Sequence, residues 1–341
     1  MYQMIRWAEG PRVSAADHPP TKIVMIPEGT PFQQVAALLE REELIRSRQA
    51  FVFLGKMQEA ERKIHPGEYE LNAAMTPEEM LAKLLAGRVL LHSVTIPEGY
   101  TIKQIADVFA EHGLAERDEF MRVVNDKFFI KSLGVSAESL EGYLYPDTYR
   151  FPRRTSGKEV IRTMVEQLGH VMTPEWQARA KDLQMTVHQV LTLASVIEKE
   201  TGSGDERPHI ASVFHNRLRK RIPLQSDPTV IYGLPNFDGN LRKKDLADPS
   251  PYNTYRWPGL PPGPIASPGA GSIRAALYPM LSPDLYFVSK NDGTHQFSAT
   301  LVEHNKAVEK YQKRPFRRGA HSQTQVTPVR GGTVPTEEGV S

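Results

Sequence analysis

Two glutamates, Glu198 and Glu200, close an apolar run in the stretch Val-Ile-Glu-Lys-Glu-Thr at residues 196–201. Burial of a carboxyl group among apolar neighbours disfavours its charged form and raises its pKa. Such a group can protonate a leaving oxygen and later accept a proton, which is what cleavage of a glycosidic bond requires near neutral pH. These residue types therefore indicate general acid–base chemistry on a glycan. The alternative interpretation is that both acids are solvated at a helix end, one of them paired with Lys199 or Arg207.

A single helix from residue 187 onward is predicted to carry both acids. Thr186 and Gln189 form a capping-box pair at its start. An apolar stripe at helical spacing consists of Val187, Val190, Leu191, Ala194 and Ile197, and the polar face is predicted to hold His188, Thr192, Ser195 and Lys199. At about 100° per residue, Glu198 and Glu200 fall at opposite edges of the stripe. Periodicity by itself therefore does not choose between them.

Polar and aromatic residues further along the chain could form a sugar site beside these acids. They lie in segments rich in proline and glycine, and long loops inside a domain are usually functional. The set consists of Gln225, Asp227, Tyr232, Tyr252, Asn253 and Tyr255. Aromatic faces can stack on sugar rings, and amides hydrogen-bond to hydroxyl groups. Each residue alone has a structural interpretation, so only the set as a whole predicts a sugar site.

The composition is that of an ordinary globular protein. The chain has 341 residues, of which 24% are charged and 40% hydrophobic, so about two domains are expected. The absence of cysteine excludes disulfides and thiolate metal sites, and the 11 histidines show no ligand spacing, so we assign no metal and no cofactor. A net charge of +2, without a basic helix or stripe, argues against nucleic acid as a partner.

No stretch of the sequence predicts a membrane span. A spanning helix needs about 18–20 predominantly apolar residues, and no run approaches that length. Residues 1–20 resemble neither a signal peptide nor a membrane helix. The chain as given is therefore expected to be soluble, with any anchor absent or removed.

An internal repeat organises the first part of the chain. The motif Ile-Pro-Glu-Gly at residues 26–29 recurs at residues 96–99. Each copy predicts a short strand, a turn and an amphipathic helix. The first copy continues with a strand at 66–71 and a helix that Thr76 and Glu79 begin as a capping box. This arrangement resembles LysM-like modules, which bind glycan chains, and the alternative is a small packing domain without a ligand.

These patterns predict an α+β protein, with one or more N-terminal LysM-like α/β modules followed by a mixed α+β catalytic domain. The predicted divisions are an N-terminal segment at 1–20, a LysM-like module at 21–90, a second repeat-like α/β segment at 91–135, a catalytic domain at 136–314 and a disordered tail at 315–341. Within the catalytic domain, helices are predicted at 158–171, 174–183, 272–281 and 300–311, and a hairpin from strands at 285–289 and 295–298.

From about residue 22 to residue 311, the chain resembles the MltG/YceG-like family, the endolytic murein transglycosylases of bacteria. Long motifs in one order carry the resemblance. They are Leu-Glu-Gly-Tyr-Leu-Tyr-Pro-Asp-Thr-Tyr at 140–149, Ala-Ser-Val-Ile-Glu-Lys-Glu-Thr at 194–201, Ala-Ser-Val-Phe-His-Asn-Arg-Leu at 211–218, Gln-Ser-Asp-Pro-Thr-Val-Ile-Tyr-Gly at 225–233, Tyr-Asn-Thr-Tyr at 252–255, Gly-Leu-Pro-Pro-Gly at 259–263, Tyr-Phe-Val at 286–288 and Glu-His-Asn at 303–305.

The resemblance implies cleavage of the β-1,4 bond between N-acetylmuramic acid and N-acetylglucosamine in nascent glycan strands, leaving a 1,6-anhydromuramyl end. It implies that Glu200, the second glutamate of its motif, is the catalytic acid, and that Glu141 of the Leu-Glu-Gly-Tyr motif is a positioning residue in or near the groove. The substrate-binding set that we predict is Glu141, Tyr145, Gln225, Asp227, Tyr252, Asn253 and Tyr255.

The resemblance also implies partners and a location. The partners are peptidoglycan glycan strands and, through the family, cell-wall synthases. Family members carry an N-terminal membrane helix that holds the catalytic domain at the outer face of the cytoplasmic membrane, and this chain departs from the family in showing none. Two other functions stay open: a hydrolytic muramidase with Glu198 or Asp227 as a second carboxylate, and a non-catalytic glycan-binding scaffold of cell-wall synthesis.

Overall fold

The computed structural model describes residues 10–313. The tail predicted to be disordered, at 315–341, lies outside the described residues, as do the first nine residues of the predicted N-terminal segment.

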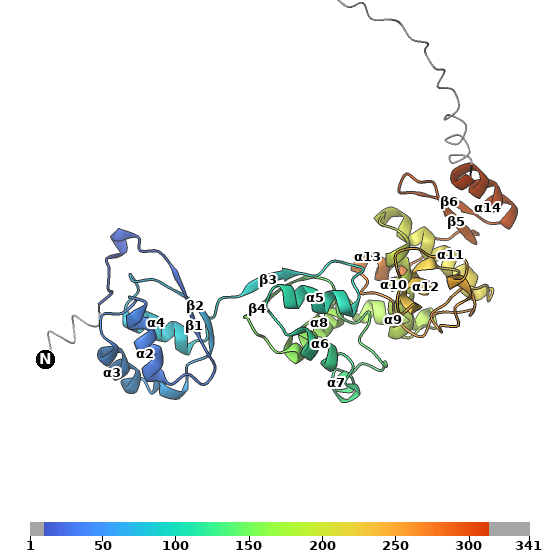
Figure 1. The fold of residues 1–341 in the computed structure, drawn as a ribbon. Helices are drawn as coiled ribbons and strands as arrows, with labels where there is room; N and C mark the ends of the chain where they lie inside the picture. Colours follow the sequence, from blue (N-terminus) through green and yellow to red (C-terminus); the bar gives the residue numbers. More distant parts are fainter. Residues whose placement is uncertain (1–9, 314–341) are drawn as a thin grey trace, which may run out of the picture. The chain divides into compact units, whose positions relative to one another are not determined.

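Two compact units make up the described chain (Figure 1). The first unit holds the chain up to residue 191 together with residues 263–270. The second unit holds residues 192–262 and the chain from residue 271 onward. A segment from late in the sequence therefore completes the first unit.

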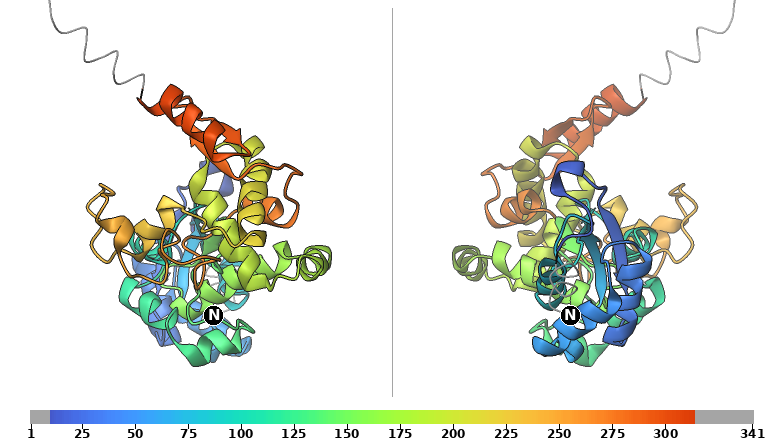
Figure 2. Two further views of the ribbon diagram at one scale, coloured as in Figure 1. Left: turned by 90° about the vertical axis from the view of Figure 1, so that its right-hand side faces the viewer. Right: turned by 90° about the vertical axis from the view of Figure 1, so that its left-hand side faces the viewer.

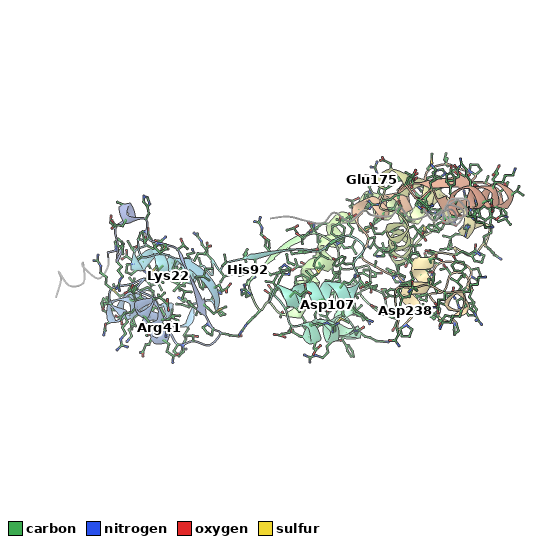
Figure 3. The ribbon with its side chains drawn as sticks, turned by 45° about the horizontal axis from the view of Figure 1, so that its top comes forward. Lys22, Arg41, His92, Asp107, Glu175 and Asp238 are labelled. Carbon is green, nitrogen blue, oxygen red and sulfur yellow. The ribbon has the colours of Figure 1, made fainter. Side chains whose placement is uncertain are left out.

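The first copy of the repeat is built on a two-stranded antiparallel sheet. Its elements are η1 (Ala15–Asp17), β1 (Lys22–Ile26), α2 (Phe32–Arg41), α3 (Arg48–Met57), η2 (Ala60–Arg62), β2 (Gly67–Leu71) and α4 (Pro77–Leu85). Val24 of β1 lies opposite Tyr69 of β2, and both are buried. The rings of Phe32 and Phe51 stack with their centroids 5.6 Å apart, so α2 and α3 share this core. Figure 3 labels Lys22, at the start of β1, on this copy.

Helix α4 begins at the predicted capping box. The Thr76 hydroxyl accepts a hydrogen bond from the backbone N–H of Glu79 at 3.2 Å, and the Glu79 carboxylate accepts one from the backbone N–H of Thr76 at 2.8 Å. Pro77 follows as the first helical residue, where its missing N–H costs no hydrogen bond. This local prediction from sequence is confirmed.

The second copy repeats the architecture of the first. Its elements are β3 (His92–Thr95), α5 (Ile102–Glu111), α6 (Arg117–Val123), α7 (Lys127–Ser132), β4 (Thr148–Phe151) and α8 (Gly157–Val171). β3 and β4 pair antiparallel, with Val94 opposite Tyr149, as Val24 lies opposite Tyr69 in the first copy. The repeated structure therefore continues past residue 135. The domain boundaries proposed from sequence stay predictions.

Helix α10 (Val187–Glu200) follows α9 (Pro174–Asp182) and begins as predicted. The Gln189 side chain accepts from the Thr186 N–H at 2.8 Å, and the Thr186 hydroxyl accepts from the Gln189 N–H at 3.2 Å. The predicted polar face is wrong at Thr192 and Ser195, which are both fully buried. The middle of α10 is buried all round, and the Ser195 hydroxyl is satisfied by donating to the Thr192 carbonyl at 2.8 Å.

The second unit is mostly helical and ends in a β-hairpin and a helix. Its further elements are η3 (Gly204–Glu206), α11 (Arg207–Arg219), α12 (Asp227–Gly233), η4 (Asp245–Ala247), α13 (Ala270–Leu277), β5 (Tyr286–Ser289), β6 (His295–Ser298), α14 (Leu301–Val308) and η5 (Glu309–Lys313). β5 and β6 pair antiparallel, and α14 packs against both strands, as both views of Figure 2 show. α13 ends earlier than predicted, two residues before Pro279.

The fold class predicted from sequence, mixed α+β, is confirmed. A LysM-like identity for the repeated modules stays a prediction. Of the helices that residues 10–313 form, none has the length and apolarity that crossing a membrane demands.

Candidate active site

Glu200 is the last residue of α10, and a hydroxyl group lies directly against its carboxyl group. Ser226, which precedes the first residue of α12, donates a hydrogen bond from its Oγ to Glu200 Oε1 at 2.5 Å. Ser226 is itself buried, and its backbone N–H is held by Thr254 Oγ1 at 3.0 Å. The carboxyl group of Glu200 is therefore fixed on one side by a donor that is fixed in turn.

The surroundings of Glu200 raise its pKa to about 7. Burial of the carboxyl group is the largest cause, and the negative charge of Asp227 raises the pKa further. The hydrogen bond from Ser226 and the positive charge of Arg217 act in the opposite direction. A carboxyl group with this pKa holds both protonation states in comparable amounts at neutral pH, as a group that is first an acid and then a base requires.

Glu198, the other acid of the helix end, has a different partner. Its Oε1 accepts a hydrogen bond from the Arg207 guanidinium at 3.0 Å, and the two side chains are only 6% and 16% exposed. This enclosed ion pair joins the end of α10 to the start of α11. Glu198 is therefore paired with Arg207, which is one of the interpretations that the sequence left open.

Arg217, on α11, organises the loop that carries Gln225. Its guanidinium donates to the carbonyls of Pro223 and Leu224 at 3.1 and 2.9 Å and to Gln225 Oε1 at 3.2 Å. Its Nε donates to the carbonyl of Leu285 at 2.6 Å. One buried guanidinium thus ties the segment before Ser226 to the segment before β5.

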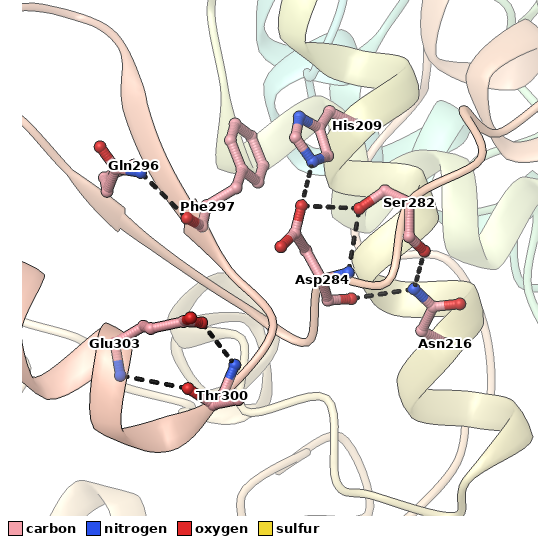
Figure 4. Close-up of polar contacts among 8 residues, drawn as sticks. All are labelled: His209, Asn216, Ser282, Asp284, Gln296, Phe297, Thr300 and Glu303. Carbon is pink, nitrogen blue, oxygen red and sulfur yellow. Dashed lines mark hydrogen bonds and ion pairs between the residues drawn. The ribbon is translucent and has the colours of Figure 1, made fainter.

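A network of polar contacts holds the segment that leads to Leu285 (Figure 4). His209 Nε2 lies 2.7 Å from Asp284 Oδ2, and the Ser282 hydroxyl donates to the same oxygen at 2.6 Å. The Asn216 amide donates to the carbonyls of Ser282 and Asp284 at 2.8 and 2.9 Å. The His209 ring stacks on Phe297 with centroids 3.5 Å apart. Two turns of α11 therefore position the carbonyl that Arg217 uses.

Asp227 and Tyr255, both predicted from sequence, are in direct contact. The Tyr255 hydroxyl donates to Asp227 Oδ1 at 2.7 Å. Burial raises the pKa of Tyr255, and the bond to Asp227 raises it further, so the hydroxyl keeps its proton at neutral pH. Asp227 follows Ser226 directly in the chain, which brings this pair beside the Glu200 carboxyl group.

Asn253 has a structural role in this structure. Its side chain is fully buried, and its amide donates to the carbonyls of Leu246 and Asp248 at 3.0 and 2.8 Å. Its Oδ1 accepts from the backbone N–H of Tyr255 at 3.0 Å. These bonds close the loop between η4 and Tyr255. The ring of Tyr252 lies 4.8 Å from that of Tyr232, also within this unit.

Glu141 and Tyr145 belong to the first unit. Glu141 is 6% exposed, and its Oε1 accepts a hydrogen bond from the backbone N–H of Ile102 at 3.0 Å. Ile102 opens α5, so this carboxylate satisfies a free donor at a helix start. The Tyr145 carbonyl accepts from the Tyr149 hydroxyl at 2.6 Å, and burial followed by the charges of Glu98 and Asp147 raises the pKa of Tyr145.

Residue-level reasoning on the sequence did not single out Ser226, Arg217 or Thr254. A signal existed, because Ser226 and Arg217 lie inside motifs at 225–233 and 211–218. Small hydroxyl residues and arginines are common enough that no spacing rule marks these positions. Over residues 10–313, the histidines and acidic residues form no group of three that could hold a metal ion.

Comparison of the chain with known proteins identifies its family. The model of the YceG-like family matches residues 24–310. The chain belongs to the YceG-like family. A relative from Bacillus subtilis named endolytic murein transglycosylase is 36% identical over an alignment of 311 residues, which covers 86% of this chain and 86% of the relative. Another relative with that name, from Streptococcus pneumoniae, is 32% identical over 84% of this chain and 57% of its own length.

A solved structure is also similar to this member of the YceG-like family. It is a crystal structure of a yceG-like protein from Listeria monocytogenes, with 36% sequence identity and a TM-score of 0.59. The match covers 84% of this chain and 98% of that chain. The similarity therefore extends over both units of the fold.

Proposed function

We propose that Glu200 is the single general acid and base with which this chain, a lytic transglycosylase acting on peptidoglycan, cleaves its substrate. The bond is the β-1,4 bond between N-acetylmuramic acid and N-acetylglucosamine in nascent glycan strands. The observation that carries the proposal is the contact between Glu200 and Ser226, in surroundings that raise the pKa of Glu200 to about 7.

The hydroxyl of Ser226 assigns a role to each oxygen of the carboxyl group. Because Ser226 donates to Oε1, the proton of the neutral acid belongs on Oε2. In the first step that proton passes to the glycosidic oxygen as the bond from the anomeric carbon to this oxygen breaks. The carboxylate then takes the proton of the muramyl 6-hydroxyl as this oxygen attacks the anomeric carbon. The product is a 1,6-anhydromuramyl end, and no water is consumed.

One carboxyl group suffices because the nucleophile belongs to the substrate. A hydrolysing glycosidase normally needs a second carboxylate, to activate water or to attack the sugar. Glu198 is enclosed in an ion pair with Arg207, and Asp227 Oδ1 accepts the Tyr255 hydroxyl. Glu198 is thus committed to its ion pair, and the exposed Asp227 is the carboxylate that a hydrolytic mechanism would have to use.

The remaining assignments belong to the same proposal. Gln225, Asp227, Tyr252 and Tyr255 bind the sugars near Glu200, and Glu141, Tyr145 and Asn253 contribute to the binding of the strand or to the frame that supports it. The enzyme acts at the outer face of the cytoplasmic membrane, where cell-wall synthases supply nascent strands.

A digest of purified peptidoglycan tests this function. We expect wild type to release anhydromuramyl ends, detected by mass spectrometry, and Glu200→Gln to release none, since the amide cannot donate and then take a proton in this way. Glu198→Gln is the matched control on the same helix, and it is expected to cleave because the proposed acid is intact. Thermal unfolding of each variant confirms that it is folded before its activity is compared.

The other readouts of this digest identify the alternatives. Reducing ends that have incorporated water would assign the chain to the hydrolytic muramidases, with Asp227 as the second carboxylate to test. If wild type and Glu200→Gln both bind glycan and neither cleaves it, the chain is a non-catalytic scaffold.

A further inference from the structure

The two copies of the repeat also correspond in their second halves. The Tyr69 hydroxyl donates to the His65 carbonyl at 2.7 Å, and the Tyr149 hydroxyl donates to the Tyr145 carbonyl at 2.6 Å. A turn precedes each tyrosine at the same register, but its backbone differs: Gly142 has a φ of +79°, whereas Arg62 ends the 3-10 helix η2 and is not in the left-handed region. Its closing hydrogen bond runs from the Lys63 N–H to the Ala60 carbonyl at 3.0 Å in one copy and from the Tyr143 N–H to the Leu140 carbonyl at 2.9 Å in the other.

In the second copy, a distant segment of the chain lies across the turn that follows the first strand. The Gly99 N–H donates to the Ser267 carbonyl at 2.8 Å, and the Ser267 N–H donates to the Tyr100 carbonyl at 2.8 Å. Ala266 and Ser267 are fully buried there. The second copy therefore binds an irregular stretch of polypeptide through two backbone hydrogen bonds to one of its residues, Ser267.

The other wall of this groove requires a glycine. Gly142 has a φ of +79°, and a Cβ built there would lie 2.3 Å from the Cβ of Pro264. Pro264 precedes Ser267 by three residues, so the same segment contacts both walls. The groove of the second copy is thus filled by residues 263–270 of its own chain.

The first copy has the corresponding groove in an open form. A cavity of about 250 Å³ lies there, lined by Ile26, Pro27, Gly29, Thr30, Pro31, Phe32, Glu61, Arg62, Ile64 and Pro66. Gly29, the counterpart of the buried Gly99, is exposed. Among the described residues, 10–313, no hydrogen bond is made by the Gly29 N–H or to the Thr30 carbonyl. These are the two backbone groups whose counterparts bind Ser267.

Charge distinguishes the open groove from the filled one. By the register of the two turns, Arg62 stands where the second copy has Gly142. Its exposed side chain lines the cavity together with that of Glu61, whose counterpart in the second copy is Glu141, so Arg62 is the charge that the second copy lacks. A segment bound in the first groove would therefore meet Arg62 at that position, and an acidic side chain is the group that an arginine there binds best.

We propose that the first copy is a docking site for a short, irregular segment of a partner protein. The segment pairs its backbone with Gly29 and Thr30 and places an aspartate or glutamate, three residues earlier, against Arg62. This interaction is separate from catalysis, because every group that it uses lies in the first copy of the repeat. The basis is the internal example: the same fold, in the same chain, already binds such a segment.

A peptide titration of the full chain tests the proposal. The probe copies residues 262–270 with the change Pro264→Asp, and the protein carries ¹⁵N-glycine. We expect the amide resonance of Gly29 to shift on titration and that of Gly99, already bonded to Ser267, to stay in place. Arg62→Glu should weaken the binding about fivefold or more, the effect of losing a charge pair of roughly 1 kcal/mol and gaining a repulsion.

A charge reversal and a control variant make the result specific. A second peptide, with Pro264→Lys, should bind Arg62→Glu more tightly than wild type. Arg41→Glu, at an exposed residue at the end of α2, should leave both affinities unchanged. The proposal is overturned if Gly29 does not respond to the acidic peptide. It is equally overturned if chitin oligosaccharides shift Gly29 while the peptide does not, which would assign the groove to glycan.

Discussion

At the scale of single residues, a hydroxyl group and a guanidinium separate two glutamates that look alike in sequence. Glu200 receives a hydrogen bond from Ser226, and its burial raises its pKa to about 7. Glu198 is enclosed with Arg207. Because both acids lie on one helix end, this difference arises entirely from what other parts of the chain bring to each of them.

Removal of the Ser226 hydroxyl should alter the pH dependence of cleavage as well as its rate. The hydrogen bond from Ser226 lowers the pKa of Glu200, so Ser226→Ala should raise that pKa. Activity requires the protonated acid in the first step and is lost as the pH rises through this pKa. The alkaline limb of the pH–rate profile should therefore move to higher pH, and kcat should fall about 10- to 100-fold because the carboxyl group is less well positioned.

The profile of Ser226→Thr, which keeps a hydroxyl, supplies the comparison. Its alkaline limb should stay near that of wild type. If the Ser226→Ala limb does not move while kcat falls, Ser226 only supports the loop and does not act on the carboxyl group of Glu200.

At the scale of elements, the loops around the site depend on buried side chains that bond to backbone. Arg217 ties the segment before Ser226 to the segment before β5, and Asn253 closes the loop that contains Tyr255. Irregular backbone cannot satisfy its own polar groups, so side chains must do so wherever a loop is buried. The polar residues of such loops therefore support the backbone, whatever further role is proposed for them.

Asn253→Ala should destabilise the protein whether or not the residue touches substrate. Three hydrogen bonds are lost and the Leu246 and Asp248 carbonyls lose a donor, which should cost about 2–4 kcal/mol of the free energy of unfolding. Thermal unfolding measures the change. Asn240→Ala, in an exposed turn, is the control and should change the stability by less than about 0.5 kcal/mol. If Asn253→Ala loses cleavage while its stability is unchanged, Asn253 acts by binding the substrate instead.

At the scale of the whole molecule, the proposed catalytic group works against stability. A carboxyl group with a folded pKa of about 7 and an ordinary unfolded value binds a proton in the folded state that the unfolded state lacks between roughly pH 4.5 and 7. The free energy of unfolding therefore falls as the pH rises through this window. Burial of an acid at an active site is a common source of such a cost.

Glu200→Gln should reverse that cost. The neutral amide has the shape of the protonated acid, so the variant should match wild type at about pH 4 and exceed it above about pH 7 by about 1–3 kcal/mol. Thermal unfolding of both proteins across this range gives the difference directly. A difference that does not depend on pH would contradict the raised pKa of Glu200.

Sequence alone determined the features that depend on neighbouring residues. The capping boxes at Thr76 and Thr186, the paired hairpin strands after residue 285 and the internal repeat all follow from local residue types, and the structure confirms them. The long motifs were enough to identify the family, because their residues and their order along the chain can be read without knowing which residues are in contact.

Tertiary structure alone decided the environments of the polar groups. Ser226 lies 26 positions from Glu200, and Glu141 lies 39 positions from the Ile102 N–H that it caps. Thr192 and Ser195, polar by type, are buried because α10 is enclosed on every side. A pKa, a cap or a filled groove depends on burial and on partners distant in sequence, and these exist only once the chain has folded.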